Sequence, residues 1–226
     1  MWTLFLALVP LGVGLILSRP LVAAWAVLVT TMVSLRTLLP AYDIWPVHFV
    51  VPLLLSAGYL AIRRGPAPSS SWAARGSFEP GIKILTFMVA ALAALGFVAW
   101  VALVRPAVFL PPGLHNQPAV VLIATGCAFA LVNAGIEELA FRGLALHALT
   151  SALRTKTIPI LLQAAAFGAL HAAPPSMPYG LGGVTMTFVY GAALGVLAVL
   201  SDGILAAWVA HAIADLLVFF VLVGWM

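Results

Sequence analysis

The sequence predicts an all-α, polytopic transmembrane helix bundle of about eight spans. Of the 226 residues, 64% are hydrophobic and only 7% are charged, whereas soluble domains carry about 25% charged residues. A transmembrane helix needs about 20 mostly apolar residues, and eight runs in this chain come close to that length. Lipid cannot satisfy open sheet edges, so helices are the expected spanning structure. The same composition excludes disordered, nucleic-acid-binding and disulfide-rich secreted proteins.

The predicted spans are separated by short breaks rich in turn-forming residues. We expect spans at residues 2–18, 20–39, 44–62, 83–104, 119–149, 158–173, 184–200 and 203–224. The longest break contains Gly65-Pro66-Ala67-Pro68 followed by three serines, a composition typical of a linker. We therefore predict an amino-terminal part, residues 1–82, with three spans and the polar linker, and a functional core, residues 83–226.

Lysines and arginines in the breaks predict the orientation of the chain. With eight spans, one side of the membrane carries Arg19, Arg63, Arg64, Arg75, Lys83, Arg154 and Lys156. The other side carries only Arg36 and Arg105. Cytoplasmic loops are enriched in positive charge, so we expect both termini outside. The expected location is the cytoplasmic membrane of a prokaryote, with the lipid bilayer as partner and no nucleic acid.

Six candidate ionisable residues, within the apolar runs or at their ends, cluster in three of the eight runs. They are Glu137, Glu138, Arg142, His171, His211 and Asp215. A charge in the middle of a membrane costs about 2.5–3.5 kcal/mol on the insertion scale, so such residues are functional candidates that face the bundle interior.

The carboxylates of the fifth run are predicted to have different roles. Glu138 and Arg142 are four residues apart, so they share a helix face in the order that favours an ion pair. On an ideal helix Glu137 points about 100° away from Glu138. It can therefore project into a cavity and act as a general base on water. The alternative is a purely structural ion cluster that locks helices together.

Similar spacing recurs in the later runs. His211 and Asp215 are four residues apart, so Asp215 can accept a hydrogen bond from the ring and fix its tautomer. Phe167 and His171 repeat the interval, which gives this histidine an aromatic neighbour. Two features with packing explanations accompany them. The segment Gly191–Gly195 predicts a helix-packing seam, and Asp202 predicts a turn or helix cap.

In this order, Glu-Glu-x-x-x-Arg, Phe-x-x-x-His and His-x-x-x-Asp resemble a known family. It is the CAAX prenyl protease 2 type, also called the CPBP or ABI family of intramembrane proteases, which includes bacteriocin-processing and lysostaphin-resistance-protein-A-like members. The matching positions lie at 137–142, 167–171 and 211–215. The resemblance covers about residues 119–224, and the part before it carries no motif.

The resemblance implies a glutamate-dependent endopeptidase that cleaves membrane-associated peptide or protein substrates, by CAAX-type or other terminal processing. If the roles of the family's residues apply to the matching positions of this chain, Glu137 and His171 would activate the attacking water. His211 and Asp215 would stabilise the oxyanion. The family commonly has Asn at the last position of the third motif. Because this chain has Asp there, the role and the charge of that residue stay open. Glu138 and Arg142 would have a structural role and stabilise the arrangement of the helices.

Three other functions use the same residues. Glu137, His171 and His211 have ligand chemistry suited to zinc, but no His-Glu-x-x-His spacing is present, so we expect no cofactor. A transporter or proton relay would also bury Glu, His and Asp, but it would be expected to show inverted repeats, and we see none. A non-catalytic immunity protein is disfavoured because the complete polar set is intact.

Overall fold

The computed structural model describes residues 19–38, 46–64, 71–107, 113–172 and 176–225. All regular structure within these ranges is helical, which confirms the all-α prediction. The first predicted span and the 65–70 part of the linker lie outside the described residues.

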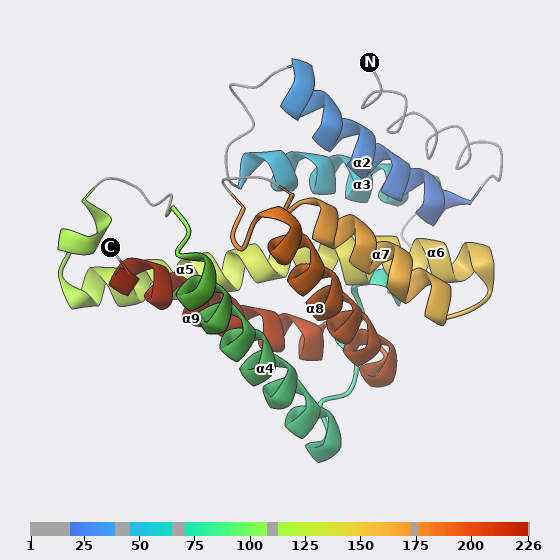
Figure 1. Ribbon diagram of the computed structural model, residues 1–226. Helices are drawn as coiled ribbons and strands as arrows, with labels where there is room; N and C mark the ends of the chain where they lie inside the picture. The colour runs from blue at the N-terminus through green and yellow to red at the C-terminus, as the bar shows by residue number, and fades with distance from the viewer. Residues whose placement is uncertain (1–18, 39–45, 65–70, 108–112, 173–175, 226) are drawn as a thin grey trace. The chain divides into compact units, whose positions relative to one another are not determined.

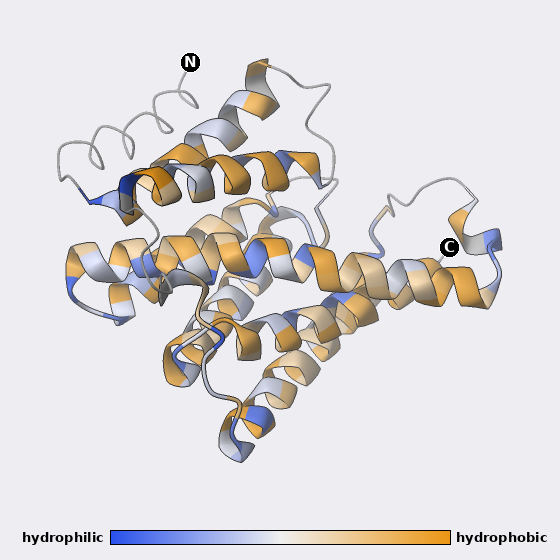
Figure 2. Ribbon diagram, turned by 180° about the vertical axis from the view of Figure 1, so that it is seen from behind, coloured by the Kyte–Doolittle hydropathy of each residue, from blue (hydrophilic) through white to orange (hydrophobic). Residues whose placement is uncertain are grey.

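Several helices have the length and composition of membrane spans. Four of the described ones do so, namely Pro80–Val104, Ala119–Leu153, Gly180–Ser201 and Leu205–Gly224. Shorter apolar helices cover Pro20–Met32, Val47–Arg63 and Thr157–Ala169. Large apolar side chains point outward from these helices, including Leu103 at 84% and Leu181 at 85% exposure, and Figure 2 shows hydrophobic residues along most of their length. Soluble proteins rarely expose such extensive apolar surface. The chain is an integral membrane protein, and the count of eight spans stays a prediction.

The chain forms two compact units, of which the first comprises Met1–Ala74 and Ile136–Pro159. Its described helices are α2 (Pro20–Leu38), α3 (Val47–Arg64), the short η2 (Ser71–Ala73), η4 (Leu139–Ala145) and α6 (Leu146–Leu153). Helix α2 lies beside α3 (Figure 1) and also packs against η4 and α6. Small side chains make this approach close, because Ala23, Ala24 and Ala26 are almost completely buried.

The second unit comprises Arg75–Gly135 and Ile160–Met226. Its helices are α4 (Pro80–Val104), η3 (Leu114–Asn116), most of α5 (Ala119–Glu138), most of α7 (Thr157–Ala169), α8 (Gly180–Ser201) and α9 (Leu205–Trp225). Helix α4 packs against both α8 and α9, which also pack against each other (Figure 1). Phe97, Trp100, Val101 and Leu222 form a buried cluster in this unit.

The turn between α8 and α9 is held by the segment that leads into α4. Asp202 caps α8 in the left-handed conformation, with φ of 54°, which confirms its predicted role. Ser77 donates its backbone N–H to Ser201 O at 2.7 Å. A side chain on Gly203 would collide with the backbone of Gly76. The close approach therefore requires glycine at position 203.

The predicted seam on α8 packs against α7. A Cβ added at Gly191 would lie 3.0 Å from Cδ1 of Phe167, and one at Gly195 would lie 2.7 Å from Nε2 of Gln163. The buried amide of Gln163 donates to Gly191 O at 2.9 Å. The two glycines thus let α7 approach closely, and this contact positions Phe167.

Candidate active site

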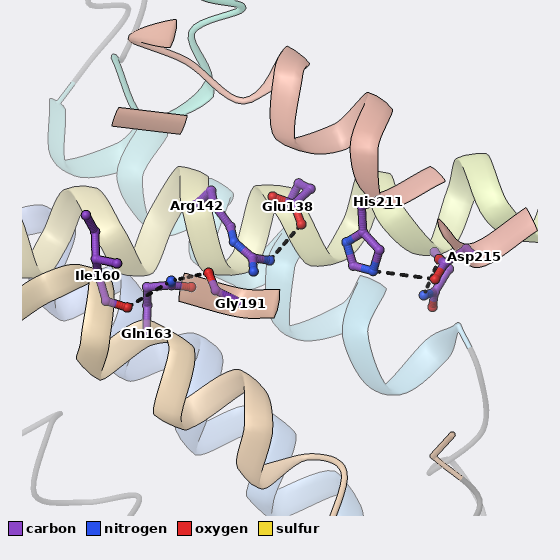
Figure 3. Close-up of polar contacts among 8 residues, drawn as sticks. Glu138, Arg142, Ile160, Gln163, Gly191, His211 and Asp215 are labelled. Carbon is purple, nitrogen blue, oxygen red and sulfur yellow. Dashed lines mark hydrogen bonds and ion pairs between the residues drawn. The ribbon is translucent and has the colours of Figure 1, made fainter. Parts of the chain in front are cut away.

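The Glu138–Arg142 ion pair lies at the junction of α5 and η4. Arg142 Nη1 donates to Glu138 Oε1 at 2.6 Å, and both side chains are fully buried. Figure 3 shows this contact. The pairing predicted from the four-residue spacing is confirmed.

The α-helix that carries both glutamates ends at Glu138 and does not continue through the rest of the motif. Residues Leu139–Ala145 form a π-helical turn. This conformation is rare in proteins overall, but where it occurs it is often at a functional site. The backbone here is closely approached, because a Cβ on Gly143 would lie 2.6 Å from the carbonyl oxygen of Trp72. Nδ1 of His147 lies 3.3 Å from Arg142 O. A carbonyl oxygen only accepts, so the ring donates there and supports the widened turn.

Glu137 has a different environment from its neighbour. Its side chain is half-buried, whereas Glu138 is fully buried. Glu137 lies in the last turn of α5, directly before the π-helical turn. The two adjacent carboxylates are therefore distinct in their surroundings, as distinct roles would require.

The second unit holds His211 and Asp215 together on α9. His211 is 3% exposed, and its Nε2 lies 3.5 Å from Asp215 Oδ1, so the predicted contact is confirmed. The other carboxylate oxygen, Oδ2, accepts a hydrogen bond from Asn133 Nδ2 of α5 at 3.0 Å. Sequence reasoning missed Asn133. A polar residue within an apolar run, one helical turn before Glu137, is the signal that could have indicated it.

Two aromatic rings enclose the imidazole of His211. Phe167 of α7 lies 5.8 Å from it at an interplanar angle of 87°. Tyr190 of α8 lies 5.6 Å away at 88°. Such edge-to-face contacts restrict the rotation of the ring. Tyr190 was also missed, because nothing in its local sequence distinguishes it from other aromatic residues of the bundle.

His171 lies just beyond α7. The helix ends at Ala169, four residues before the predicted end of the span. The chain leaves the helix through a tighter turn, in which Leu170 N donates to Phe167 O at 3.2 Å. The His171 ring turns back so that its Nδ1 lies 3.2 Å from the same oxygen. Its ring also meets that of Phe167 at 5.3 Å, which confirms the predicted aromatic neighbour.

The predicted residues are thus found in two groups, each within its own unit. Glu138 contacts Arg142 in the first. His171 and His211 share the Phe167 ring in the second, with Asp215 beside His211.

The residues that the structure describes contain no group of three or more His, Cys, Asp or Glu side chains that could hold a metal ion. Catalytic zinc takes three protein ligands and a water. The donor sets among the described residues do not fit such a site.

Comparison with known proteins gives one match. No curated protein and no solved structure matches the chain. A family model described as type II CAAX prenyl endopeptidase Rce1-like matches residues 118–217. This segment contains all three motifs and all six candidate residues. Residues 118–217 are therefore similar to the Rce1-like type II CAAX prenyl endopeptidases, and the similarity covers the part of the chain that carries the three motifs.

Proposed function

We propose that the chain hydrolyses a peptide bond of a membrane-associated substrate with a water activated by Glu137 and His171. The observation that carries the proposal is the arrangement of the two histidines around Phe167. Each ring has one nitrogen engaged by the protein, His171 by Nδ1 and His211 by Nε2. These contacts orient the two rings.

The engaged nitrogens suit the two histidines to different tasks. Because a carbonyl oxygen accepts at Nδ1 of His171, that nitrogen carries a proton, and in the neutral ring Nε2 has the lone pair that a general base needs. His211 directs Nε2 to the carboxylate of Asp215, and in the proposed mechanism its Nδ1 meets the substrate. When this ring carries both protons, Nδ1 donates to the oxyanion that develops in acyl transfer.

The proposed reaction balances without a cofactor. The water donates a hydrogen bond to Nε2 of His171, which orients it, and its other proton passes to Glu137 while the water oxygen forms a bond to the scissile carbonyl carbon. The resulting oxyanion is stabilised by His211. The tetrahedral intermediate then collapses, the C–N bond breaks, and the proton held by Glu137 passes to the leaving amine. Glu138 and Arg142 hold the turn that follows Glu137.

The substrate class follows from the family and the surroundings of these residues. The candidate residues belong to apolar helices or the turn that follows one, so the scissile bond must approach from the membrane or its surface. We propose CAAX-type or other terminal processing of a membrane-associated protein, in the cytoplasmic membrane of a prokaryote.

The test uses purified protein reconstituted in lipid vesicles with two fluorogenic peptides, one prenylated at a carboxy-terminal CAAX sequence and one unmodified. We expect cleavage by the wild type and none by Glu137→Ala. Glu79→Ala is the matched control, because Glu79 is an exposed glutamate before α4, and it should cleave normally. Full cleavage by Glu137→Ala would overturn the mechanism.

A second arm identifies the natural substrate. The termini of membrane proteins are compared by mass spectrometry between cells with the wild-type chain and cells with Glu137→Ala. A terminus that is present only with the wild type names the substrate and the bond that is cut.

A further inference from the structure

Asn133 connects α5 to the candidate histidine site on α9. Its Nδ2 donates to Asp215 Oδ2 at 3.0 Å, while Asp215 Oδ1 lies 3.5 Å from Nε2 of His211. We propose that Asn133 is a positioning residue: it holds the carboxylate of Asp215, and that carboxylate orients His211 and keeps a proton on its Nε2. This inference rests on the proposed function for the role of His211.

The two oxygens of Asp215 face different residues, so Asn133 can affect His211 through this one carboxylate. A carboxylate rotates about its Cβ–Cγ bond in a broad, shallow well. A donor on one oxygen limits that rotation and so places the other oxygen. Without Asn133, Asp215 would still lie one turn after His211, but it would lose the donor on Oδ2 that helps to set the direction of Oδ1.

The surroundings of His211 explain why a small rotation of Asp215 matters. Phe167 and Tyr190 meet the imidazole nearly edge-on from α7 and α8. They restrict the plane of the ring, but an aromatic edge does not determine which ring nitrogen carries the proton. That choice is made by the hydrogen-bond partner of one nitrogen. The carboxylate beside Nε2 of His211 is that of Asp215, at 3.5 Å, and Asn133 in turn holds it.

Exchange of donor and acceptor provides the sharpest test. Asn133→Asp alone sets two carboxylates against each other at a hydrogen-bond distance, so the contact is lost. When Asn133→Asp is combined with Asp215→Asn, the hydrogen bond between the two positions is restored with donor and acceptor exchanged. The amide nitrogen at position 215 then donates to the carboxylate at position 133, and the amide oxygen at position 215 faces His211. Asn133→Leu removes the donor with little change in volume.

Steady-state cleavage of the fluorogenic peptide gives the kinetic readout. Misplacement of a reacting group by about 1 Å can cost up to about 100-fold in rate. We expect Asn133→Leu and Asn133→Asp to lower kcat at least about tenfold, with KM changed less than about twofold. The double variant Asn133→Asp/Asp215→Asn should recover the kcat of Asp215→Asn alone.

Trp208→Phe is the matched control for helix packing. Trp208 Nε1 of α9 donates to Leu131 O of α5 at 3.1 Å, so it joins the same two helices without involving Asp215 or His211. This variant should keep kcat within about twofold. An equal loss of kcat in Trp208→Phe would overturn the proposal, because the loss of any hydrogen bond between α5 and α9 would then explain the effect.

A spectroscopic arm requires no substrate. In protein with ¹⁵N-labelled histidine, the His211 signals are assigned by their loss in His211→Gln. We expect a single, defined protonation pattern in the wild type and averaged tautomers in Asn133→Leu. Unchanged His211 signals in Asn133→Leu would overturn the positioning role. If instead Glu137→Ala cleaved normally, the proposed mechanism would fail while this measurement still decided the role of Asn133.

Discussion

The buried Glu138–Arg142 pair predicts that two adjacent glutamates fail in different ways when they are replaced. Removing one member of a buried ion pair leaves the other charge unpaired and costs about 3–5 kcal/mol. Both side chains are fully buried and 2.6 Å apart, so Glu138→Ala and Arg142→Ala should approach this full cost. Folded proteins are stable by about 5–15 kcal/mol. Each variant should therefore lose folded protein and activity together.

The magnitude is large enough to measure directly. A loss of about 4 kcal/mol lowers the ratio of folded to unfolded protein roughly a thousandfold, since about 1.4 kcal/mol corresponds to a factor of ten. Glu137 is half-buried, and Glu137→Ala should accumulate as folded but inactive protein. Replacement of both pair members, Glu138→Leu with Arg142→Met, leaves no charge behind and should regain most of the stability.

Thermal unfolding and folded yield in detergent separate these cases, with cleavage measured on the folded fraction. Lys156→Ala is a suitable control, because it removes an exposed cation from the same unit, and it should unfold like the wild type. The reasoning would be refuted if either single alanine variant at the pair were as stable as the wild type. It would also be refuted if the double apolar variant were no more stable than the singles.

Three further predictions concern metal, orientation and Asp215. The purified protein should contain no stoichiometric zinc and should remain active with a chelator; zinc near one per chain, with activity lost on its removal and regained on its return, would favour a metalloprotease. Cysteines introduced at Ser70 and Thr155 should be labelled from the cytoplasmic side and one at Asn116 from the other side; labelling of all three from one side would contradict eight spans. Asp215→Asn should keep substantial cleavage and Asp215→Ala should lose most of it, because an amide oxygen accepts the same bond; an Asn variant as inactive as the Ala variant would show that the charge is required.

Interactions within one helix could be predicted from the sequence. The pairs Glu138–Arg142 and His211–Asp215 follow from the helical period alone, which brings residues four apart to one face. The seam at Gly191 and Gly195 could be predicted for the same reason, since only small residues allow two helices to approach closely.

Interactions between helices could not be predicted in the same way. Asn133 and Asp215 are 82 residues apart, and Tyr190 reaches His211 from another helix. In a soluble protein the polar face of a helix indicates which side is buried. Here the helices are apolar on all sides, because lipid replaces water at the outer face. Their sequences therefore do not specify which face packs inward. The π-helical turn at 139–145 also depends on tertiary surroundings, such as the close approach of Trp72 to Gly143.

The four-residue interval recurs in all three motifs, but it serves three different contacts. It joins two side chains at Glu138 and Arg142, an imidazole and a carboxylate at His211 and Asp215, and an imidazole and a backbone carbonyl at His171. Within lipid no water is available for an unpaired polar group. A polar residue that has a partner on its own segment is therefore satisfied as soon as that segment inserts, before the helices assemble. The Asn133–Asp215 hydrogen bond, by contrast, must wait for assembly, because it crosses from α5 to α9. Orientation of His211 through that contact would then be complete only in the packed bundle, so that the site becomes active only when the helices are correctly assembled.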